Sequence, residues 1–303
     1  MANAPVAVID LGTNTFHLLI VRITDTDGQF QEVYRERRFV KLAEEGIQTI
    51  GQTPFERGLN TLQHYRQLMD EHGVRRYQAT GTAALRTASN GKEFVSRAAE
   101  LGIRIDLISG DEEAHLISQG VLLAIPPLQE DRALIMDIGG GSVEFIFVTT
   151  EGVEWARSFP VGVAVLYRQF HHSEPIANEE ITAAKDFLRQ KLAPLWDAVK
   201  TYPINYLVGA AGTFDVIADL MGKGSPTPNS HIIDLTAFDS FYNQCLEANQ
   251  EERHQMKGVP SNRADMIVVA LILVQVVLEE VQPDTLLVSD YSMKEGILRD
   301  ILT

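Results

Sequence analysis

The sequence predicts a two-domain α/β protein. Its 303 residues are more than a single hydrophobic core usually organises. One pattern is written twice, as VAVIDLGTNTFHLLIVRI at residues 6–23 and as LIMDIGGGSVEFIFV at residues 134–148. Apolar segments typical of strands alternate with segments of helical spacing along the rest of the chain. A repeat of this kind indicates two domains of similar construction.

Each copy of the repeat is typical of a strand, a tight turn and a second strand. In both copies an apolar run ends on an aspartate, which is followed by an aliphatic residue, a glycine, two small residues and a hydroxyl. The aligned positions are Asp10 with Asp137, Gly12 with Gly139, and Thr15 with Ser142. Glycines allow a close backbone approach, and successive N–H groups in such a turn form a concave site for phosphate. A plain glycine hairpin is the alternative, and the repetition favours the phosphate site.

Acidic residues beside the turns predict a cation site in the second copy. Glu144 lies seven residues after Asp137 and just past the turn, so the two carboxylates could share a divalent metal. An ordinary outward-facing strand residue is the alternative for Glu144. The first copy has His17 where the second has Glu144. We therefore expect metal beside Asp137, and phosphate or water-mediated contacts at Asp10.

Charge argues against nucleic acid as the main partner. The formal net charge is −15, whereas nucleic-acid binding depends on a basic surface. A phosphate ligand needs only local positive charge, which Arg35, Arg37, Arg38 and Lys41 could supply. On a strand, Arg35 and Arg37 would share one face and Arg38 the other. A solvated edge strand is the alternative for this segment.

Other features predict a cytoplasmic protein without a membrane partner. The single Cys245 excludes an intramolecular disulfide and a cysteine metal cluster. The first residues do not resemble a signal peptide. The longest apolar stretch, 266–278, is too short to span a bilayer and is expected to be a buried helix. A homodimer is an open possibility.

In the first half of the chain, helical spacing predicts helices over 53–72 and 91–101, with a short strand over 77–80 between them. The motif GTAALR at 81–86 follows that strand. Arg86 stands just past its Gly-Thr turn, where a guanidinium could hold phosphate oxygens in bidentate geometry. A surface or salt-bridged arginine is the alternative.

A strand over 104–108 leads to a helix over 109–124 that opens with Asp111, Glu112 and Glu113. Carboxylates in a first turn complement the helix dipole, and a serine or aspartate there can cap the helix. Capping accounts for acidic residues in general and not for a run of three. One of these carboxylates could therefore accept a proton from an attacking water.

Two prolines and several polar residues at 126–132 interrupt the chain, so we place the domain boundary there. The domains are then 1–125 and 126–303, and the last helix could pack back on the first domain. Beyond the second hairpin, helices are expected over 163–170 and 179–201.

A further glycine-rich turn, GAAGT, follows a short strand and opens a helix. A turn of this kind can bind phosphate, because the N–H groups at the start of the helix point toward an anion. Gly209, Gly212 and Thr213 are therefore candidates. Neither the GxGxxG spacing nor a Walker lysine is present. Residues 222–231 are expected to form a mobile loop, from which Lys223 could reach a polyanion.

Taken in order, the motifs resemble the exopolyphosphatase/guanosine pentaphosphate phosphohydrolase (Ppx/GppA) family. They read DLGTNTFHLLI, GTAALR, ISGDEEAHLI, DIGGGSVE, GAAGT, NRAD and SDYSMKEGIL. The resemblance covers residues 6–302. It implies two ribonuclease-H-like α/β domains of the actin-like ATPase and sugar-kinase superfamily, with a cleft between them.

The resemblance also implies roles for single residues. Glu113 matches the general base, and Arg86 matches a phosphate-binding arginine. Asp137 and Glu144 match carboxylates linked to a divalent metal, Mg²⁺ or Mn²⁺. The phosphate-binding candidates are Asp10, Gly12, Thr13, Asn14 and Thr15 in the first turn and Gly139, Gly140, Gly141 and Ser142 in the second.

The chain departs from the family pattern in two places. Longer members continue into a C-terminal helical domain, so features that depend on that domain, such as gripping very long chains, are not predicted here. The glycine of an SDxGxxEG-like ending is absent, since Asp290 is followed by Tyr291, Ser292 and Met293. The sequence alone offers no functional interpretation of that change.

The expected reaction is metal-assisted, in-line attack of water on a phosphoanhydride. It would release the terminal phosphate of inorganic polyphosphate or the 5′ γ-phosphate of guanosine pentaphosphate. A kinase or ATPase of the wider superfamily is one alternative. A non-enzymatic sensor that binds polyphosphate or the alarmone is another.

Overall fold

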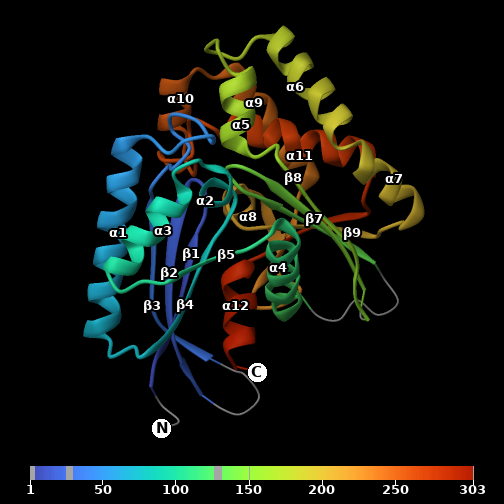
Figure 1. Cartoon of the computed structure of the whole chain (residues 1–303). Helices are drawn as coiled ribbons and strands as arrows, with labels where there is room; N and C mark the ends of the chain where they lie inside the picture. The colour runs from blue at the N-terminus through green and yellow to red at the C-terminus, as the bar shows by residue number, and fades with distance from the viewer. Residues whose placement is uncertain (1–3, 25–29, 126–131, 150, 303) are drawn as a thin grey trace. The chain divides into compact units, whose positions relative to one another are not determined.

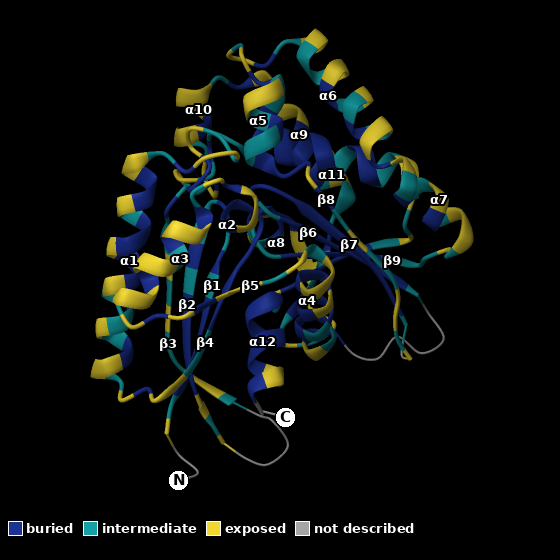
Figure 2. Cartoon of the chain, viewed as in Figure 1, coloured by how far each residue is buried: buried dark blue, intermediate teal, exposed yellow. Residues whose placement is uncertain are grey.

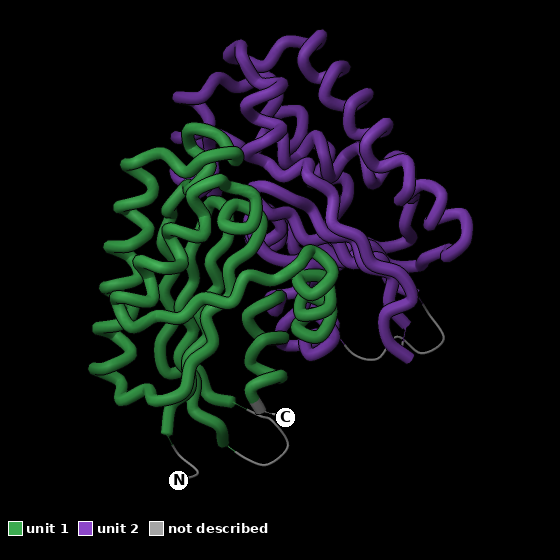
Figure 3. Tube along the Cα trace, in the orientation of Figure 1, with its two compact units in different colours: residues 1–120, 293–303 green, residues 121–292 purple. Residues whose placement is uncertain are grey.

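The computed structural model describes residues 4–24, 30–125, 132–149 and 151–302. Contacts within the chain divide it into two compact units (Figure 3). The first unit comprises Met1–Gly120 with Met293–Thr303, and the second comprises Val121–Ser292.

We expected the boundary in the segment 126–132, and the division of the chain lies between Gly120 and Val121. Most of that segment, 126–131, lies outside the described residues. The first unit ends inside helix α4, Gly110–Ala124, rather than after it. The last helix, α12 at Met293–Leu302, groups with the first unit.

The first unit contains a five-stranded sheet in the order β3-β2-β1-β4-β5. Its strands are β1 (Val6–Leu11), β2 (Thr15–Ile23), β3 (Phe30–Phe39), β4 (Arg76–Gly81) and β5 (Ile105–Leu107). The first three strands form an antiparallel meander, whereas β4 and β5 run parallel to β1. The first copy of the sequence repeat therefore begins this sheet.

The second unit contains a seven-stranded sheet in the order β10-β11-β12-β9-β6-β7-β8. The strands are β6 (Ala133–Ile138), β7 (Val143–Thr149), β8 (Gly152–Phe159), β9 (Tyr206–Ala210), β10 (Gly222–Gly224), β11 (Ser230–Ile233) and β12 (Thr285–Ser289). Strands β6 to β8 again form an antiparallel meander, and β9 and β12 run parallel to β6. The five strands β8-β7-β6-β9-β12 thus repeat the topology of the first sheet. The predicted pair of α/β domains is confirmed, while the cleft between them stays a prediction.

In the first unit, helices cover both faces of the sheet (Figure 1). Alternate residues of β1, namely Ala7, Ile9 and Leu11, face a core that they share with α1 (Gln52–Glu71) and α3 (Gly91–Glu100). Because strand residues alternate between faces, Asp10 belongs to the other face. There Arg35 of β3 donates to the fully buried Glu295 of α12 at 3.2 Å.

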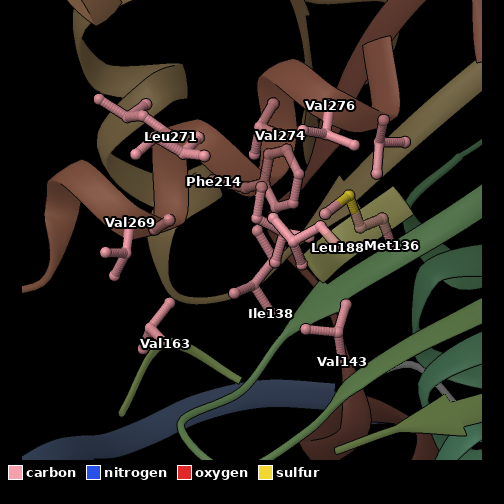
Figure 4. Packing of buried hydrophobic residues seen from close by; sticks show 14 of the residues in the cluster. Met136, Ile138, Val143, Val163, Leu188, Phe214, Val269, Leu271, Val274 and Val276 are labelled. Carbon is pink, nitrogen blue, oxygen red and sulfur yellow. The ribbon is translucent and has the colours of Figure 1, made fainter. Parts of the chain in front are cut away.

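The second unit is built around α11, Ile267–Val281, which is buried along most of its length (Figure 2). This helix confirms the buried element expected in the longest apolar stretch. Met136, Ile138 and Val143 of the second hairpin face the same core as Phe214 and the residues of α11 (Figure 4). Strand alternation therefore places Asp137 on the opposite face of the sheet.

The remaining helices of the second unit are α5 (Val163–Phe170), α6 (Asn178–Lys191), α7 (Ala193–Thr201), α8 (Thr213–Met221), α9 (Leu235–Glu247) and α10 (Gln250–Gln255). Within the described ranges, no helix combines the length and the hydrophobicity that crossing a bilayer requires.

Two expectations about secondary structure were wrong. Residues 179–201 form two helices rather than one, because Pro194 lacks the amide that would continue α6 and stands instead in the first turn of α7. Residues 222–231 were expected to form a mobile loop. They include β10 and the start of β11, which pair antiparallel with each other, and β11 pairs with β12. Pairing with the sheet, rather than local propensity, decides this segment.

Helix α12 makes a close contact with α4 that tolerates only glycine. A Cβ atom on Gly296 would lie 1.8 Å from the carbonyl oxygen of Leu116. We predict that Gly296→Ala lowers the free energy of unfolding by about 1–3 kcal/mol, because backbone must move to admit the methyl group. Gly224→Ala is the control, since its nearest neighbour would be the Ile232 side chain at 4.0 Å. Equal urea midpoints for both variants would contradict the prediction.

The start of α6 predicts an acid-sensitive contribution to stability. Burial alone would raise the pKa of Glu180, but hydrogen bonds from the Ser173 hydroxyl and from the amides of Ala177 and His172 outweigh it and lower the pKa to about 2. Glu180 therefore stabilises the fold above its usual pKa of 4.5, and this contribution is lost as the pH falls toward about 2.

We predict that Glu180→Gln makes the unfolding free energy less dependent on pH between those two values. Urea titrations at a series of pH values measure this dependence. Glu179→Gln, at the exposed neighbouring position, serves as the control and should follow the wild type. If the unfolding free energy of Glu180→Gln depends on pH as strongly as that of the wild type, Glu180 does not make this contribution.

Candidate functional site

The two glycine turns have the same geometry. The amide of Gly12 donates to the carbonyl of Thr15 at 3.0 Å, and the amide of Gly139 donates to that of Ser142 at 3.0 Å. A Cβ atom on either glycine would lie 3.0 Å from the same carbonyl. The repetition seen in the sequence therefore extends to the atoms of each turn.

The carbonyls of the first turn are occupied by the chain that follows β3. Val40 and Lys41 donate to the carbonyl of Asn14 at 3.0 and 2.9 Å, and Leu42 donates to that of Thr13 at 2.8 Å. In a trans peptide the C=O and the following N–H point in opposite directions. The amide edge of this turn therefore faces away from residues 40–42.

The second turn is held in the corresponding way by the start of α5. Backbone hydrogen bonds run from Val163 to Gly139 (3.0 Å), from Ala164 to Gly140 (2.9 Å) and from Gly162 to Gly141 (3.3 Å). Across the part of the chain that the structure describes, the amides of Gly140, Gly141 and Ser142 have no acceptor in the protein. Three successive amides of this kind can bind an anion.

In the first unit, three neighbouring strands bring the candidate residues to one edge of the sheet. Leu11, Gly81 and Leu107 are adjacent in the parallel register of β1, β4 and β5. The first turn follows β1, the short helix α2 (Ala83–Thr87) follows β4, and α4 follows β5. The carboxyl edge of parallel strands is where α/β proteins usually bind ligands.

At this edge Arg86 and Glu113 contact each other. The Nη1 atom of Arg86 donates to Glu113 Oε2 at 3.3 Å and to the carbonyl of Ile108 at 2.6 Å. Only 8% of Glu113 is exposed. The two residues that the sequence nominated for catalysis are therefore an ion pair, although 27 positions separate them along the chain.

The other carboxylates of the α4 first turn have different surroundings. Glu112 accepts hydrogen bonds from the amide and the hydroxyl of Ser109 at 2.8 and 2.9 Å, and its own amide donates to that hydroxyl at 3.2 Å. This is a capping box, in which the hydrogen bond from the Ser109 amide lowers the pKa of Glu112. Asp111 is exposed. Glu113 is thus the one carboxylate of the three that is buried, and the cap does not use it.

In the second unit, Asp137 and Glu144 lie directly opposite each other on β6 and β7. Directly opposite residues share one face of a sheet, with Cβ atoms about 4.5–5.5 Å apart. Asp137 is 8% exposed and Glu144 is 1% exposed, so Glu144 is not an outward-facing strand residue. At the equivalent place in the first sheet, Asp10 lies opposite His17.

The acidic pair supplies two of the oxygen ligands that a divalent cation such as Mg²⁺ would need. Mg²⁺ prefers oxygen ligands and commonly uses one or two carboxylates together with water and substrate phosphates. No cluster of three or more potential metal ligands occurs among the described residues. Asp137 and Glu144 could therefore hold a cation whose other ligands come from water and substrate.

The third glycine turn leaves the same edge of the second sheet. Asp137, Ala210 and Ser289 are adjacent in the register of β6, β9 and β12. Gly212 has a φ of +57°, a conformation that favours glycine, and the buried Thr213 begins α8. Gly209 lies inside β9, where a Cβ atom would be 2.0 Å from the ring of Phe214, so packing explains this glycine.

The structure adds three polar residues that the sequence did not nominate for the site. A guanidinium nitrogen of Arg263 would lie 3.5 Å from a Cβ atom on Gly212. Ser158 donates to Glu144, and Ser292 donates to Asp137, each at 2.6 Å. Arg263 belongs to the NRAD motif, and the Ser292 position was visible as a departure from the family ending. Nothing in the sequence around Ser158 indicates its contact.

The basic residues of β3 follow the predicted alternation. Arg35 pairs with Leu19 and Arg37 with His17, on the face opposite to that of Arg38. Strand β3 is the edge of its sheet, and Arg35 is paired with Glu32 at 2.7 Å. These observations favour the alternative of a charged edge strand. Lys223 is exposed on β10.

Comparison with known proteins identifies the family. The Ppx/GppA phosphatase family matches residues 19–303. The guanosine-5′-triphosphate,3′-diphosphate pyrophosphatase of Photobacterium profundum is 28% identical over 98% of this chain and 59% of its own length. A bifunctional 3-dehydroquinate synthase/phosphatase of Fusobacterium nucleatum is 28% identical over 94% of this chain and 44% of its own length. The chain thus spans about half the length of these curated relatives.

Two solved structures match over nearly their full length. An exopolyphosphatase from Cytophaga hutchinsonii is 35% identical, with a TM-score of 0.92, and the match covers 98% of this chain and 97% of that one. A Ppx/GppA family member from Aquifex aeolicus is 26% identical, with a TM-score of 0.81 over 99% and 98% of the two chains. The resemblance inferred from the motifs is confirmed: the chain belongs to the Ppx/GppA phosphatase family.

Proposed function

We propose that this protein hydrolyses phosphoanhydrides. Its substrates would be inorganic polyphosphate, from which it releases the terminal phosphate, or guanosine pentaphosphate, from which it releases the 5′ γ-phosphate. The contact between Glu113 and Arg86 carries this proposal, because it joins a buried carboxylate to a guanidinium at the strand edge that also bears the first glycine turn. The names of the Photobacterium and Cytophaga relatives support the same substrate classes.

Glu113 is the residue that would activate water. A carboxylate can act as the general base only if it is ionised and within hydrogen-bond reach of the water. Glu112 is engaged in the helix cap, whereas Glu113 is held by the guanidinium of Arg86. Arg86 keeps Glu113 in one orientation, and its planar guanidinium has further N–H donors suited to phosphate oxygens.

The glycine turns would bind the phosphates. Phosphoryl transfer asks little covalent chemistry of the protein, so catalysis depends on positioning and on stabilising charge. The amides of Gly140, Gly141 and Ser142 are already oriented by the hydrogen bonds from α5 to the turn carbonyls. Donors that are already in place need no reorganisation as charge develops.

We further propose that Asp137 and Glu144 hold Mg²⁺ or Mn²⁺. When bound there, such an ion would neutralise charge on the phosphate oxygens. The cross-strand pairing and low exposure of the two carboxylates support this assignment. Asp10 would contact phosphate or water, since His17 stands opposite it.

Phosphate release from polyphosphate and from guanosine pentaphosphate, measured side by side with Mg²⁺ and with no acceptor other than water, tests the proposal. We expect Glu113→Gln to lower kcat by about 10²–10⁴-fold, which is the usual contribution of a general base. Substrate affinity and the unfolding midpoint should remain. Glu112→Gln is the matched control, because it alters the cap and keeps Glu113.

Three outcomes would contradict the proposal. Full turnover by Glu113→Gln would show that Glu113 is not the general base. Binding of either substrate without any metal-dependent turnover would indicate a sensor. Transfer that requires an added acceptor would indicate a kinase.

The close contact between α5 and the second turn predicts a separate effect on phosphate binding. A Cβ atom on Gly162 would lie 2.5 Å from the carbonyl carbon and oxygen of Gly140. We predict that Gly162→Ala displaces the turn and weakens binding of pyrophosphate by at least about tenfold, which corresponds to about 1.4 kcal/mol. Isothermal titration calorimetry measures this affinity. Wild-type affinity in a folded Gly162→Ala variant would show that the turn does not bind phosphate.

A further inference from the structure

We propose that two serine hydroxyls, those of Ser158 and Ser292, are positioning groups for the acidic pair. Ser292 orients Asp137 and Ser158 orients Glu144, so that both carboxylates are ready to receive a divalent cation. This inference rests on the metal site of the proposed function and adds two residues to it.

The contact of Ser292 with Asp137 is short and enclosed. Ser292 Oγ donates to Asp137 Oδ2 at 2.6 Å, and the serine is only 3% exposed. The turn that carries Ser292 is itself secured by Ser289, whose hydroxyl accepts from the amide of Tyr291 at 3.2 Å and donates to its carbonyl at 2.7 Å. The glycine of the SDxGxxEG-like ending would stand at position 292, and glycine has no hydroxyl to donate. The substitution therefore adds a hydrogen-bond donor to the carboxylate.

Ser158 reaches the other carboxylate from the neighbouring strand. It lies directly opposite Glu144 in the register of β7 and β8, and its Oγ donates to Glu144 Oε1 at 2.6 Å. Ser158, Glu144, Asp137 and Ala210 thus form one row across β8, β7, β6 and β9. The hydroxyl of Ser158 stands at one end of this row, and the small side chain of Ala210 stands at the other end, next to Asp137.

Two adjacent carboxylates of low exposure repel each other, because water screens their charges poorly. A hydroxyl donor stabilises the charged form of each carboxylate, and distances near 2.6 Å are typical of charge-assisted O–H···O⁻ hydrogen bonds. The donor also restricts rotation of the carboxylate.

Orientation of the ligands is important for Mg²⁺ in particular. Mg²⁺ demands near-octahedral geometry, so a carboxylate that rotates freely loses affinity for it. Groups that hydrogen-bond to metal ligands typically contribute about 10–100-fold to metal affinity or activity. The two serines supply that support from opposite sides of the pair, one from a strand and one from a turn.

Binding of Mn²⁺ without substrate, followed by the electron paramagnetic resonance of the free ion, tests the inference. We expect Ser158→Ala and Ser292→Ala each to weaken Mn²⁺ binding by about tenfold or more, in variants that still unfold cooperatively on heating. Ser158→Thr keeps a hydroxyl and should restore most of the affinity. Ser118→Ala is the matched control, because this serine is as buried as Ser292 and donates to the carbonyl of His115 at 2.7 Å.

Asp137→Asn separates this inference from the proposed function. If Asp137→Asn loses Mn²⁺ while both serine-to-alanine variants bind it as the wild type does, the metal site stands and the role of the serines is overturned. If the wild type and Asp137→Asn bind Mn²⁺ equally, or neither binds it, the metal assignment fails and the inference fails with it. An equal loss in Ser118→Ala would also overturn it, since the effect would then be general.

Discussion

Parallel pairing of strand ends is the constraint on which the rest of this structure depends. In each unit the hairpin strand and two further strands finish at one edge, and most candidate segments leave from such an edge. The first turn, Arg86 and Glu113 follow β1, β4 and β5, respectively. The second turn, the turn at Gly212 and the turn at Ser292 follow β6, β9 and β12. Residues that are distant in sequence are thereby grouped by register alone.

Buried charge in these segments is matched by hydrogen-bond donors. Glu113 is held by a guanidinium, Asp137 by Ser292 and Glu144 by Ser158. An ionised carboxylate in a poorly hydrated place is costly unless it is paired or hydrogen-bonded. Each donor therefore makes the fold compatible with a charge that the proposed chemistry requires, and in the same contact it fixes the orientation of the carboxylate.

Much of the fold and part of the site could be predicted, for identifiable reasons. The doubled hairpin was predictable because strand and turn patterns are local, and the register places Asp10 opposite His17 and Asp137 opposite Glu144, as the alignment required. Strands β10 and β11 were not predictable, because a segment rich in glycine and proline pairs only when a neighbouring strand is present. A single helix over 179–201 was the wrong prediction, because Pro194 cannot donate the backbone hydrogen bond that a helix interior requires.

By itself, the sequence determined the family, the two α/β domains and the chemical types available at the glycine turns, since these depend on local patterns and on motif order. Tertiary structure alone decided that Glu113 meets Arg86. It also decided that Ser158 and Ser292 contact the acidic pair. Partners so far apart in the chain are chosen by strand register and by the direction of side chains, which no local pattern encodes.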